Sequence, residues 1–169
     1  MKKLKTYVLM LAKTFPSHHY LKGQPTDFSL KALYGEKIHT IRVNWPLWIE
    51  RIDSVNNGFA CISVREWSGK PYNSPQVELF KIYKCGYEHV VSNEKLFQVL
   101  DPEYLKSANI AQSWLAQNDG LNTKQFVSWF EKINKQNRLI IIHFTDFRYT
   151  GKVSTRNAES YLIPTPQSN

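Results

Sequence analysis

Short apolar runs, each bounded by turn-forming or charged residues, recur along most of the chain. Runs of strand length that end at Gly, Pro, Asn or Lys favour β-strands, because a strand buries a few consecutive or alternating side chains. The Asn56-Asn57-Gly58 turn precedes one such run, which we expect to pair with the next run along the chain. The pattern predicts a central strand over 139–144 and further strands over 7–12, 59–64, 76–83, 87–91 and 147–153.

Helical periodicity is confined to short segments. Thr26 is expected to cap a short helix that carries Phe28 and ends at Gly35, where a residue without a side chain suits the left-handed conformation. The clearest helix follows Asn122 or Thr123, either of which can cap it. Its apolar face consists of Phe126, Val127, Trp129, Phe130 and Ile133. Less regular segments, each expected to hold a helical turn or a short helix, lie at 44–52, from 101, and at 110–116.

Strands outnumber helices and follow one another in hairpin-like order, which predicts an α+β, mainly β fold. We expect a small mixed β-barrel with two or three flanking helices. A length of 169 residues fits one domain, which the pattern places at 1–154. Residues 155–169, which include Pro164 and Pro166, are expected to form a flexible C-terminal tail.

Charge and hydropathy narrow the expected partners. The chain is 42% hydrophobic and 14% aromatic, enough for a substantial core, and its formal charge of +8 favours polyanions such as RNA or DNA. The first apolar run is too short for a signal peptide and is better explained as a strand. No run reaches the roughly 18 apolar residues of a membrane span, so no membrane partner is expected.

The chain contains Cys and His residues, but their spacing does not match that of a metal-binding or cofactor-binding motif. Cys61 and Cys85 form no CxxC or Cys/His pattern, which indicates no disulfide framework and favours a reducing cytoplasm. The five His residues lack metal-ligand spacing, and His143 is expected to be a core or rim residue. No Gly-rich phosphate loop occurs, so we expect neither a metal nor a cofactor.

Polar chemistry concentrates between Gly35 and Arg42. Lys37, His39 and Arg42 are candidates to contact a ligand. In a regular strand, side chains alternate between faces, which puts Lys37 and His39 on one face and Thr40 on the other. Lys37 and Thr40 meet only if a turn or bulge near Lys37 breaks that alternation. A Lys with a lowered pKa can deprotonate a hydroxyl group for attack on an amide, whereas the alternative is a surface Lys and an unrelated strand Thr.

Three blocks of the sequence resemble the ASCH domain family. The segment Gly35-x-Lys37-x-x-Thr40-Ile41-Arg42, after a short helix with Phe28, is similar to the family's signature. The segment Ala116-x-x-Asp119-Gly120-Leu121, before a helix, resembles its acidic-residue-Gly-apolar motif, and the strand over 139–144 matches its closing strand. The resemblance implies a β-barrel related to the PUA fold, which is associated with RNA binding and modification, here with an insertion at about 66–115.

The resemblance extends to small bacterial ASCH amidohydrolases that cleave N4-acetylcytidine with a Lys, a Thr and a Glu. It implies Thr40 as nucleophile, Lys37 as base and Asp119 as the orienting acid. Asp119 is one methylene shorter than the family's Glu. A carboxylate displaced by about 1 Å slows a positioned reaction on the order of 100-fold.

A second group of candidates lies in a loop rich in Gly, Ser and Pro. Its cationic and aromatic side chains suit phosphate binding and base stacking. These residues are Arg65, Trp67, Lys70 and Tyr72. Trp45 and Trp48 are also close in sequence, but we expect them to pack in the core, because Trp is highly buried on average.

These features predict a binding module for nucleic acid, RNA more than DNA, or for a modified nucleobase. The ligand would lie in a basic, aromatic-lined cleft to which His39 and Arg42 contribute. The alternative is an amidohydrolase that acts on an N-acylated nucleoside through Lys37, Thr40 and Asp119. A protein-interaction domain is the third reading, which a large exposed apolar patch would favour.

Overall fold

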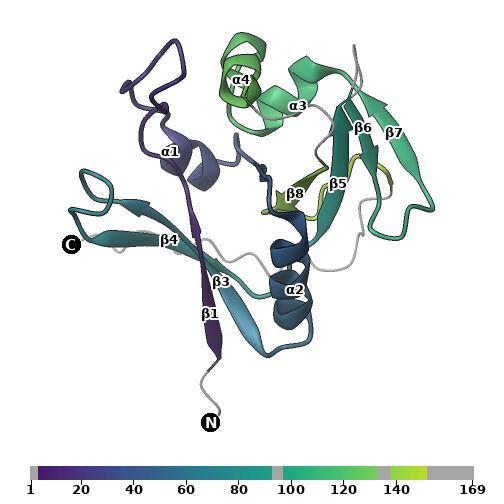
Figure 1. Ribbon diagram of the computed structural model, residues 1–169. Helices are drawn as coiled ribbons and strands as arrows, with labels where there is room; N and C mark the ends of the chain where they lie inside the picture. The colour runs from purple at the N-terminus through teal and green to yellow at the C-terminus, as the bar shows by residue number, and fades with distance from the viewer. Residues whose placement is uncertain (1–3, 93–96, 133–137, 152–169) are drawn as a thin grey trace.

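The computed structural model describes residues 4–92, 97–132 and 138–151, and its strands form two sheets (Figure 1). The first sheet has the order β1-β3-β4, with β1 parallel and β4 antiparallel to β3. Its strands are β1 (Lys5–Met10), β3 (Ala60–Trp67) and β4 (Gln76–Ile82). The antiparallel β3–β4 pair confirms the pairing predicted from the sequence.

The second sheet has five strands in the order β2-β8-β5-β6-β7, and every neighbouring pair is antiparallel. Its strands are β2 (His39–Arg42), β8 (Leu139–His143), β5 (Tyr87–Ser92), β6 (Phe97–Leu100) and β7 (Ser107–Ile110). All residues of β8 are buried, and the strand has a partner on each side, as predicted for a central strand. In contrast, β2 lies at an edge of this sheet.

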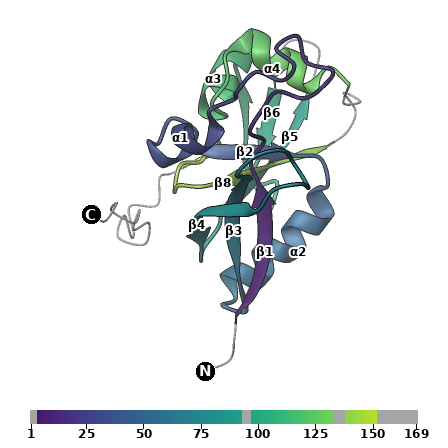
Figure 2. The same cartoon turned by 90° about the vertical axis from the view of Figure 1, so that its left-hand side faces the viewer.

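Helices lie at both ends of the second sheet's β2–β8 pair. They are α1 (Phe28–Leu33), α2 (Trp45–Asn56), α3 (Gln112–Asn118) and α4 (Thr123–Phe130). Seen from the side, β2 and β8 lie between the α3–α4 pair and the three-stranded sheet (Figure 2). The ends of β2 and α3 are thereby brought close together, although about 80 residues separate them in sequence.

The α+β, mainly β class is confirmed, whereas the predicted closed barrel is not formed. No ladder joins the two sheets within the described strands. Instead, α2 lies between the two sheets and contacts both β3 and β8 (Figure 1). The fold is two open sheets that share an apolar interior.

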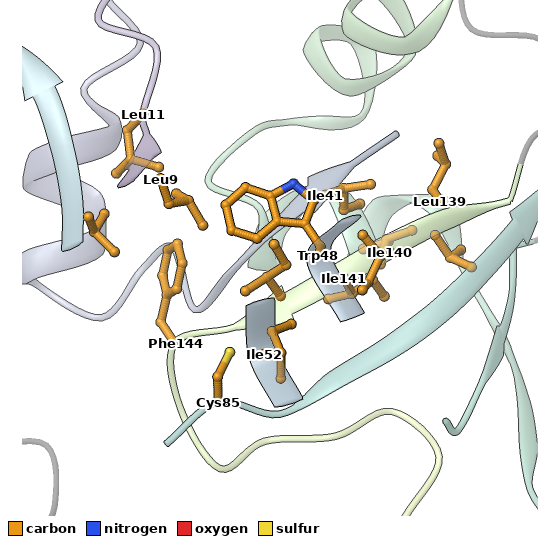
Figure 3. Close-up of a cluster of buried hydrophobic side chains, with 14 of the residues drawn as sticks. Leu9, Leu11, Ile41, Trp48, Ile52, Cys85, Leu139, Ile140, Ile141 and Phe144 are labelled. Atoms are coloured by element: carbon orange, nitrogen blue, oxygen red, sulfur yellow. The ribbon is translucent and has the colours of Figure 1, made fainter. Parts of the chain in front are cut away.

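The shared interior is built around one face of α2. Trp48 and Ile52 of this helix lie between Leu9 of β1 and Ile140 and Ile141 of β8 (Figure 3). All five side chains are buried, and removing such apolar area from water is the main driving force for packing the sheets together. The helical turn expected within 44–52 is in fact part of a 12-residue helix, because Pro46 occupies the first turn of that helix, where a missing N–H is tolerated.

The capping residues predicted from the sequence are confirmed at two helix ends and wrong at a third. Gly35 has φ +77° after α1, and Asn122 forms a reciprocal capping box with Gln125 at the start of α4, both as expected. The N-cap of α1 is Asp27 rather than Thr26. Thr26 is instead buried, and its hydroxyl group donates to the Ala12 carbonyl at 2.5 Å.

Two predicted elements are replaced by turns. Residues 101–106 form the turn between β6 and β7 rather than a short helix, with Tyr104 at φ 58°. Residues 147–151 contain no strand, and the rest of the strand predicted over 147–153 lies outside the described residues, as does the predicted tail at 155–169. Sequence periodicity is weakest in such short segments, where one apolar side chain more or less decides the assignment.

Candidate functional site

The two sequence blocks of the candidate site meet through their backbones. Lys37 precedes β2, and Asp119 is the C-cap residue of α3. The two residues form an isolated antiparallel bridge, and the Ile38 N–H donates to the Asn118 carbonyl at 3.0 Å. The backbone therefore fixes Lys37 beside Asp119 before any side-chain interaction is considered.

The side chains of Lys37 and Asp119 form a buried ion pair. The Lys37 Nζ donates to Asp119 Oδ1 at 2.6 Å and to the Asp119 carbonyl at 2.7 Å, and it lies 4.1 Å from the centroid of the Phe28 ring. The exposed fractions are 2% for Lys37 and 5% for Asp119. Burial lowers the pKa of Lys37 against the pull of Asp119. Burial acts to raise the pKa of Asp119, but Lys37 and His39 outweigh it and the net shift is downward.

Gly120 allows this close approach. Its φ is +76°, a conformation that favours glycine. A Cβ atom at this position would lie 3.2 Å from the Lys37 Cβ and 3.3 Å from the Lys31 Cδ. The Lys31 Nζ in turn donates to the Gly120 carbonyl at 2.9 Å. Asp119 therefore supplies the ionic partner of Lys37. Gly120, next in sequence, leaves room for the side chains of Lys37 and Lys31.

Thr40 shares a small cavity with the ion pair. The cavity measures about 50 Å³, and its polar wall consists of Lys37, Thr40, Arg42 and Asp119. Among the described residues, the Thr40 hydroxyl group makes no hydrogen bond to Lys37 or Asp119. Because β2 begins only at His39, Lys37 lies outside the alternation of the strand and can face the same cavity as Thr40. The sequence-predicted pair is thus brought together without being bonded.

Arg42 is held in place by the neighbouring sheet. Its Nη2 donates to the Met10 carbonyl at 2.7 Å, which ties the edge strand β2 to the end of β1. Met10 also lines the cavity. Arg42 therefore closes the cavity on the side of the three-stranded sheet, in addition to any contact it makes with a ligand.

His39 extends the polar cluster into the second sheet. It is fully buried and stands opposite His143 in the β2–β8 ladder. Its Nε2 lies 2.9 Å from the Tyr149 hydroxyl group, and its Nδ1 lies 3.6 Å from Asp119 Oδ1, which is longer than a hydrogen bond. Asn118 also donates to the Tyr149 hydroxyl group, at 2.8 Å.

A second buried carboxylate, Glu88, lies on β5, the neighbour of β8 on its other side. Glu88 accepts hydrogen bonds from His143 Nε2 at 2.8 Å, from the Tyr149 N–H at 3.0 Å, and from the Thr150 N–H and hydroxyl group at 2.9 and 2.6 Å. Burial opposes ionisation of Glu88, but these donors, led by His143, hold its pKa at about 2. Burial lowers the pKa of His143 to about 4, so a neutral imidazole donates to an ionised carboxylate at neutral pH.

Sequence reasoning missed several members of this cluster. Glu88 interrupts the apolar pattern of a predicted strand, and that interruption is the signal that would have found it. Asn118 directly precedes Asp119 in the second resemblance block. Tyr149 has no comparable signal, because only the fold brings it beside His39. His143 is buried, as expected of a core residue.

The aromatic-basic candidates lie elsewhere, on the β3–β4 hairpin. None of the four, Arg65, Trp67, Lys70 and Tyr72, lines the Lys37 cavity. The Arg65 Nε donates to Ser63 Oγ at 2.7 Å. The Trp67 and Tyr72 ring centroids lie 5.3 Å apart, and Tyr72 is 89% exposed. The structure therefore separates two groups that the sequence placed in one cleft, and it buries Trp48 as expected while leaving Trp45 half-buried.

Comparison of the chain with known protein families, with curated proteins and with solved structures found no match. In residues 4–92, 97–132 and 138–151, no group of three or more His, Cys, Asp or Glu side chains is placed to hold a metal ion. None of the helices in those ranges is long and apolar enough to cross a membrane. The geometry of the site is therefore the basis on which a function can be inferred for this protein.

Removing one partner of the ion pair is expected to destabilise the fold strongly. Lys37→Met leaves Asp119 buried without its cation, which lowers the free energy of unfolding by about 3–5 kcal/mol. The double variant Lys37→Met/Asp119→Leu removes both charges and should recover most of that loss. Urea unfolding of the three proteins measures both effects, and equal stability of the single and double variants would contradict the ion pair.

Acid is expected to destabilise the protein through Glu88 and His143. Their ordinary pKa values of 4.5 and 6.5 apply to the unfolded chain, whereas the folded values are about 2 and about 4. The unfolded chain thus binds more protons, so the free energy of unfolding falls with pH, from 6.5 to 4 through His143 and from 4.5 to 2 through Glu88. Each group contributes on the order of 3 kcal/mol.

A matched pair of variants tests whether His143 causes the fall in the free energy of unfolding between pH 6.5 and 4. His143→Gln keeps an amide donor for Glu88 and removes the titrating imidazole, so urea unfolding between pH 6.5 and 4 should show a shallower slope. His18→Gln, at a half-buried position outside the cluster, should keep the wild-type slope. The assignment is wrong if the two variants behave alike.

Proposed function

We propose that the chain is an ASCH-type, PUA-related binding module for nucleic acid, RNA more than DNA, or for a modified nucleobase. The observation that supports this most is that Lys37, Thr40 and Asp119, picked out by resemblance in two distant blocks, line one cavity. Lys37 and Thr40 belong to one block, so the informative contact is with Asp119, which a chance match in a distant block would not place in the same cavity. Buried polar groups that converge in a cavity are typical of ligand sites.

The cavity offers both donors and acceptors to a neutral polar group. Lys37 uses two of its N–H groups on Asp119, which leaves the third for a ligand. The Thr40 hydroxyl group can donate and accept. A phosphate would face the Asp119 carboxylate, so a carbonyl or amide group of a base fits better. A volume of about 50 Å³ admits such a substituent, whereas ligand pockets for whole small molecules measure about 300–1,000 Å³.

The β3–β4 hairpin supplies a surface for the rest of a polynucleotide. Tyr72 is almost fully exposed beside the half-buried Trp67, and an exposed aromatic ring of this kind can stack on an unpaired base. Lys70 is exposed on the same hairpin, and the formal charge of the chain is +8. Cations beside a stacking surface attract phosphates without sequence preference. In this proposal the hairpin binds the bases and phosphates of a polynucleotide, whereas the cavity binds one polar substituent of a base.

Binding to RNA is expected to depend on salt and on Tyr72. Anisotropy of labelled single-stranded RNA and DNA of the same sequence should show tighter binding to RNA, and at least about a tenfold loss of affinity between 50 and 200 mM salt. Tyr72→Ala should weaken binding by about 1–3 kcal/mol.

Tyr83→Ala is the matched control, because Tyr83 is 59% exposed just beyond the other end of β4. This variant should bind like the wild type. Absence of binding to both nucleic acids at low salt would overturn the proposal, as would equal effects of the two substitutions.

A second candidate function, amide hydrolysis of an N-acylated nucleoside, is favoured by the state of Lys37. Burial lowers the pKa of Lys37, which is what a general base requires, and its amine faces the same cavity as Thr40. In this reaction Lys37 in its neutral amine form takes the Thr40 proton, the alkoxide attacks the acyl carbonyl, and the C–N bond breaks as the amine leaves with that proton. Water then hydrolyses the acyl-threonine ester and releases the free acid.

Hydrolysis is expected to require the Thr40 hydroxyl group. Thr40→Val keeps the side-chain volume and should abolish release of cytidine from N4-acetylcytidine, followed by chromatography, while urea unfolding shows a folded protein. Thr6→Val, at an exposed position of β1, is the control and should retain activity. A wild-type protein that releases no product from a panel of N-acylated nucleosides would rule out this second function.

A further inference from the structure

A chain of polar groups, all buried except the half-buried Asn118, leads away from the Lys37 cavity. Asn118 Nδ2 lies 2.8 Å from the Tyr149 hydroxyl group, which lies 2.9 Å from His39 Nε2. His39 Nδ1 lies 3.6 Å from Asp119 Oδ1, the oxygen that accepts from Lys37. These groups come from the end of α3, from β2 and from the segment after β8, so only the folded protein aligns them.

The hydrogen-bond partners favour one placement of the protons. An amide nitrogen can only donate, so the Tyr149 oxygen accepts from Asn118, and the Tyr149 proton finds an acceptor when it is donated to His39 Nε2. Burial raises the pKa of Tyr149, which keeps that proton on the hydroxyl group at neutral pH. Burial also lowers the pKa of His39, which keeps the imidazole neutral. When Nε2 accepts the Tyr149 proton, the single imidazole proton lies on Nδ1, the nitrogen nearest Asp119 Oδ1, which has no hydrogen-bond partner among the described residues.

We infer that His39 and Tyr149 are positioning residues that hold the Asp119 carboxylate on the Lys37 amine. The inference concerns the site of the proposed function and extends it, since a ligand in the cavity meets an amine whose orientation these residues set. Tyr149 fixes the His39 ring, and the His39 Nδ1–H then directs a donor at Asp119 Oδ1. At 3.6 Å this contact is long, and catalytic or binding contacts of this kind tighten when a ligand is bound.

Stability alone does not account for the arrangement. Buried polar and charged groups contribute little net stability compared with apolar side chains of similar volume. Here Lys37, His39 and Asp119 are all at least nine-tenths buried, and the apolar side chains of Phe28 and Ile41 line the cavity beside Lys37 and Asp119. His39 Nδ1 is buried without a hydrogen-bond partner among the described residues, and a buried polar atom left unpaired in this way costs stability, so Asp119 Oδ1, 3.6 Å away, is the acceptor it faces.

Nuclear magnetic resonance of protein labelled with ¹⁵N at His and Lys tests the inference without any ligand. We expect the wild-type His39 to carry its proton on Nδ1. Tyr149→Phe frees the ring, so the Lys37 ammonium resonance should shift, and Tyr20→Phe at a 48% exposed position should leave it unchanged. Asn118→Ala is the second variant, which removes the outer donor and should shift the same resonance by a smaller amount.

A wild-type His39 with its proton on Nε2 would overturn the inference. So would an unchanged Lys37 resonance in both Tyr149→Phe and Asn118→Ala, because a merely structural role lowers stability without altering Lys37 in the folded protein. If RNA binding or hydrolysis is found, Tyr149→Phe should weaken it about 10- to 100-fold relative to Tyr20→Phe. If the resonances shift but the wild type neither binds nor hydrolyses, the positioning role stands and the proposed function falls.

Discussion

A lysine amine removed from water needs a negative partner within hydrogen-bonding distance, and in this protein Asp119 meets that need for Lys37. Lys37 lies between the end of α1 and the start of β2, and Asp119 caps the end of α3. The ion pair therefore joins these three elements. The backbone bridge between the two residues sets the distance, and Gly120 leaves the space. The cavity beside Thr40 exists because these conditions are met together.

The polar cluster spans the three neighbouring strands β2, β8 and β5 of the second sheet. His39 and His143 stand opposite each other on β2 and β8, each directed at its own carboxylate, Asp119 or Glu88. Tyr149 contacts both halves, through its hydroxyl group to His39 and through its N–H to Glu88. A cluster so connected responds as a unit, because the unpaired donor or acceptor left by one change must be met by its neighbours.

The closed cavity and the exposed hairpin suggest two kinds of recognition. The cavity is small, and its polar wall presents donors and acceptors from Lys37, Thr40 and Asp119, which suits discrimination of one substituent on a base. The hairpin with Trp67 and Tyr72 presents an exposed aromatic ring at Tyr72, and stacking on such a ring requires no particular base sequence. Binding and hydrolysis would use the same three cavity residues, and they differ in whether Thr40 acts as a nucleophile or only as a hydrogen-bonding group.

The sequence by itself determined the parts that depend on local patterns. Apolar runs identified β1, β3, β4, β5 and β8, Gly35 and Asn122 marked helix ends, and the resemblance singled out Lys37, Thr40 and Asp119. Only the tertiary structure decided that the sheets stay open, with α2 between them. It also decided that Tyr149 and Glu88 belong with His39 and His143. Such contacts join residues far apart in sequence, and their burial, which sets the charges, exists only in the folded chain.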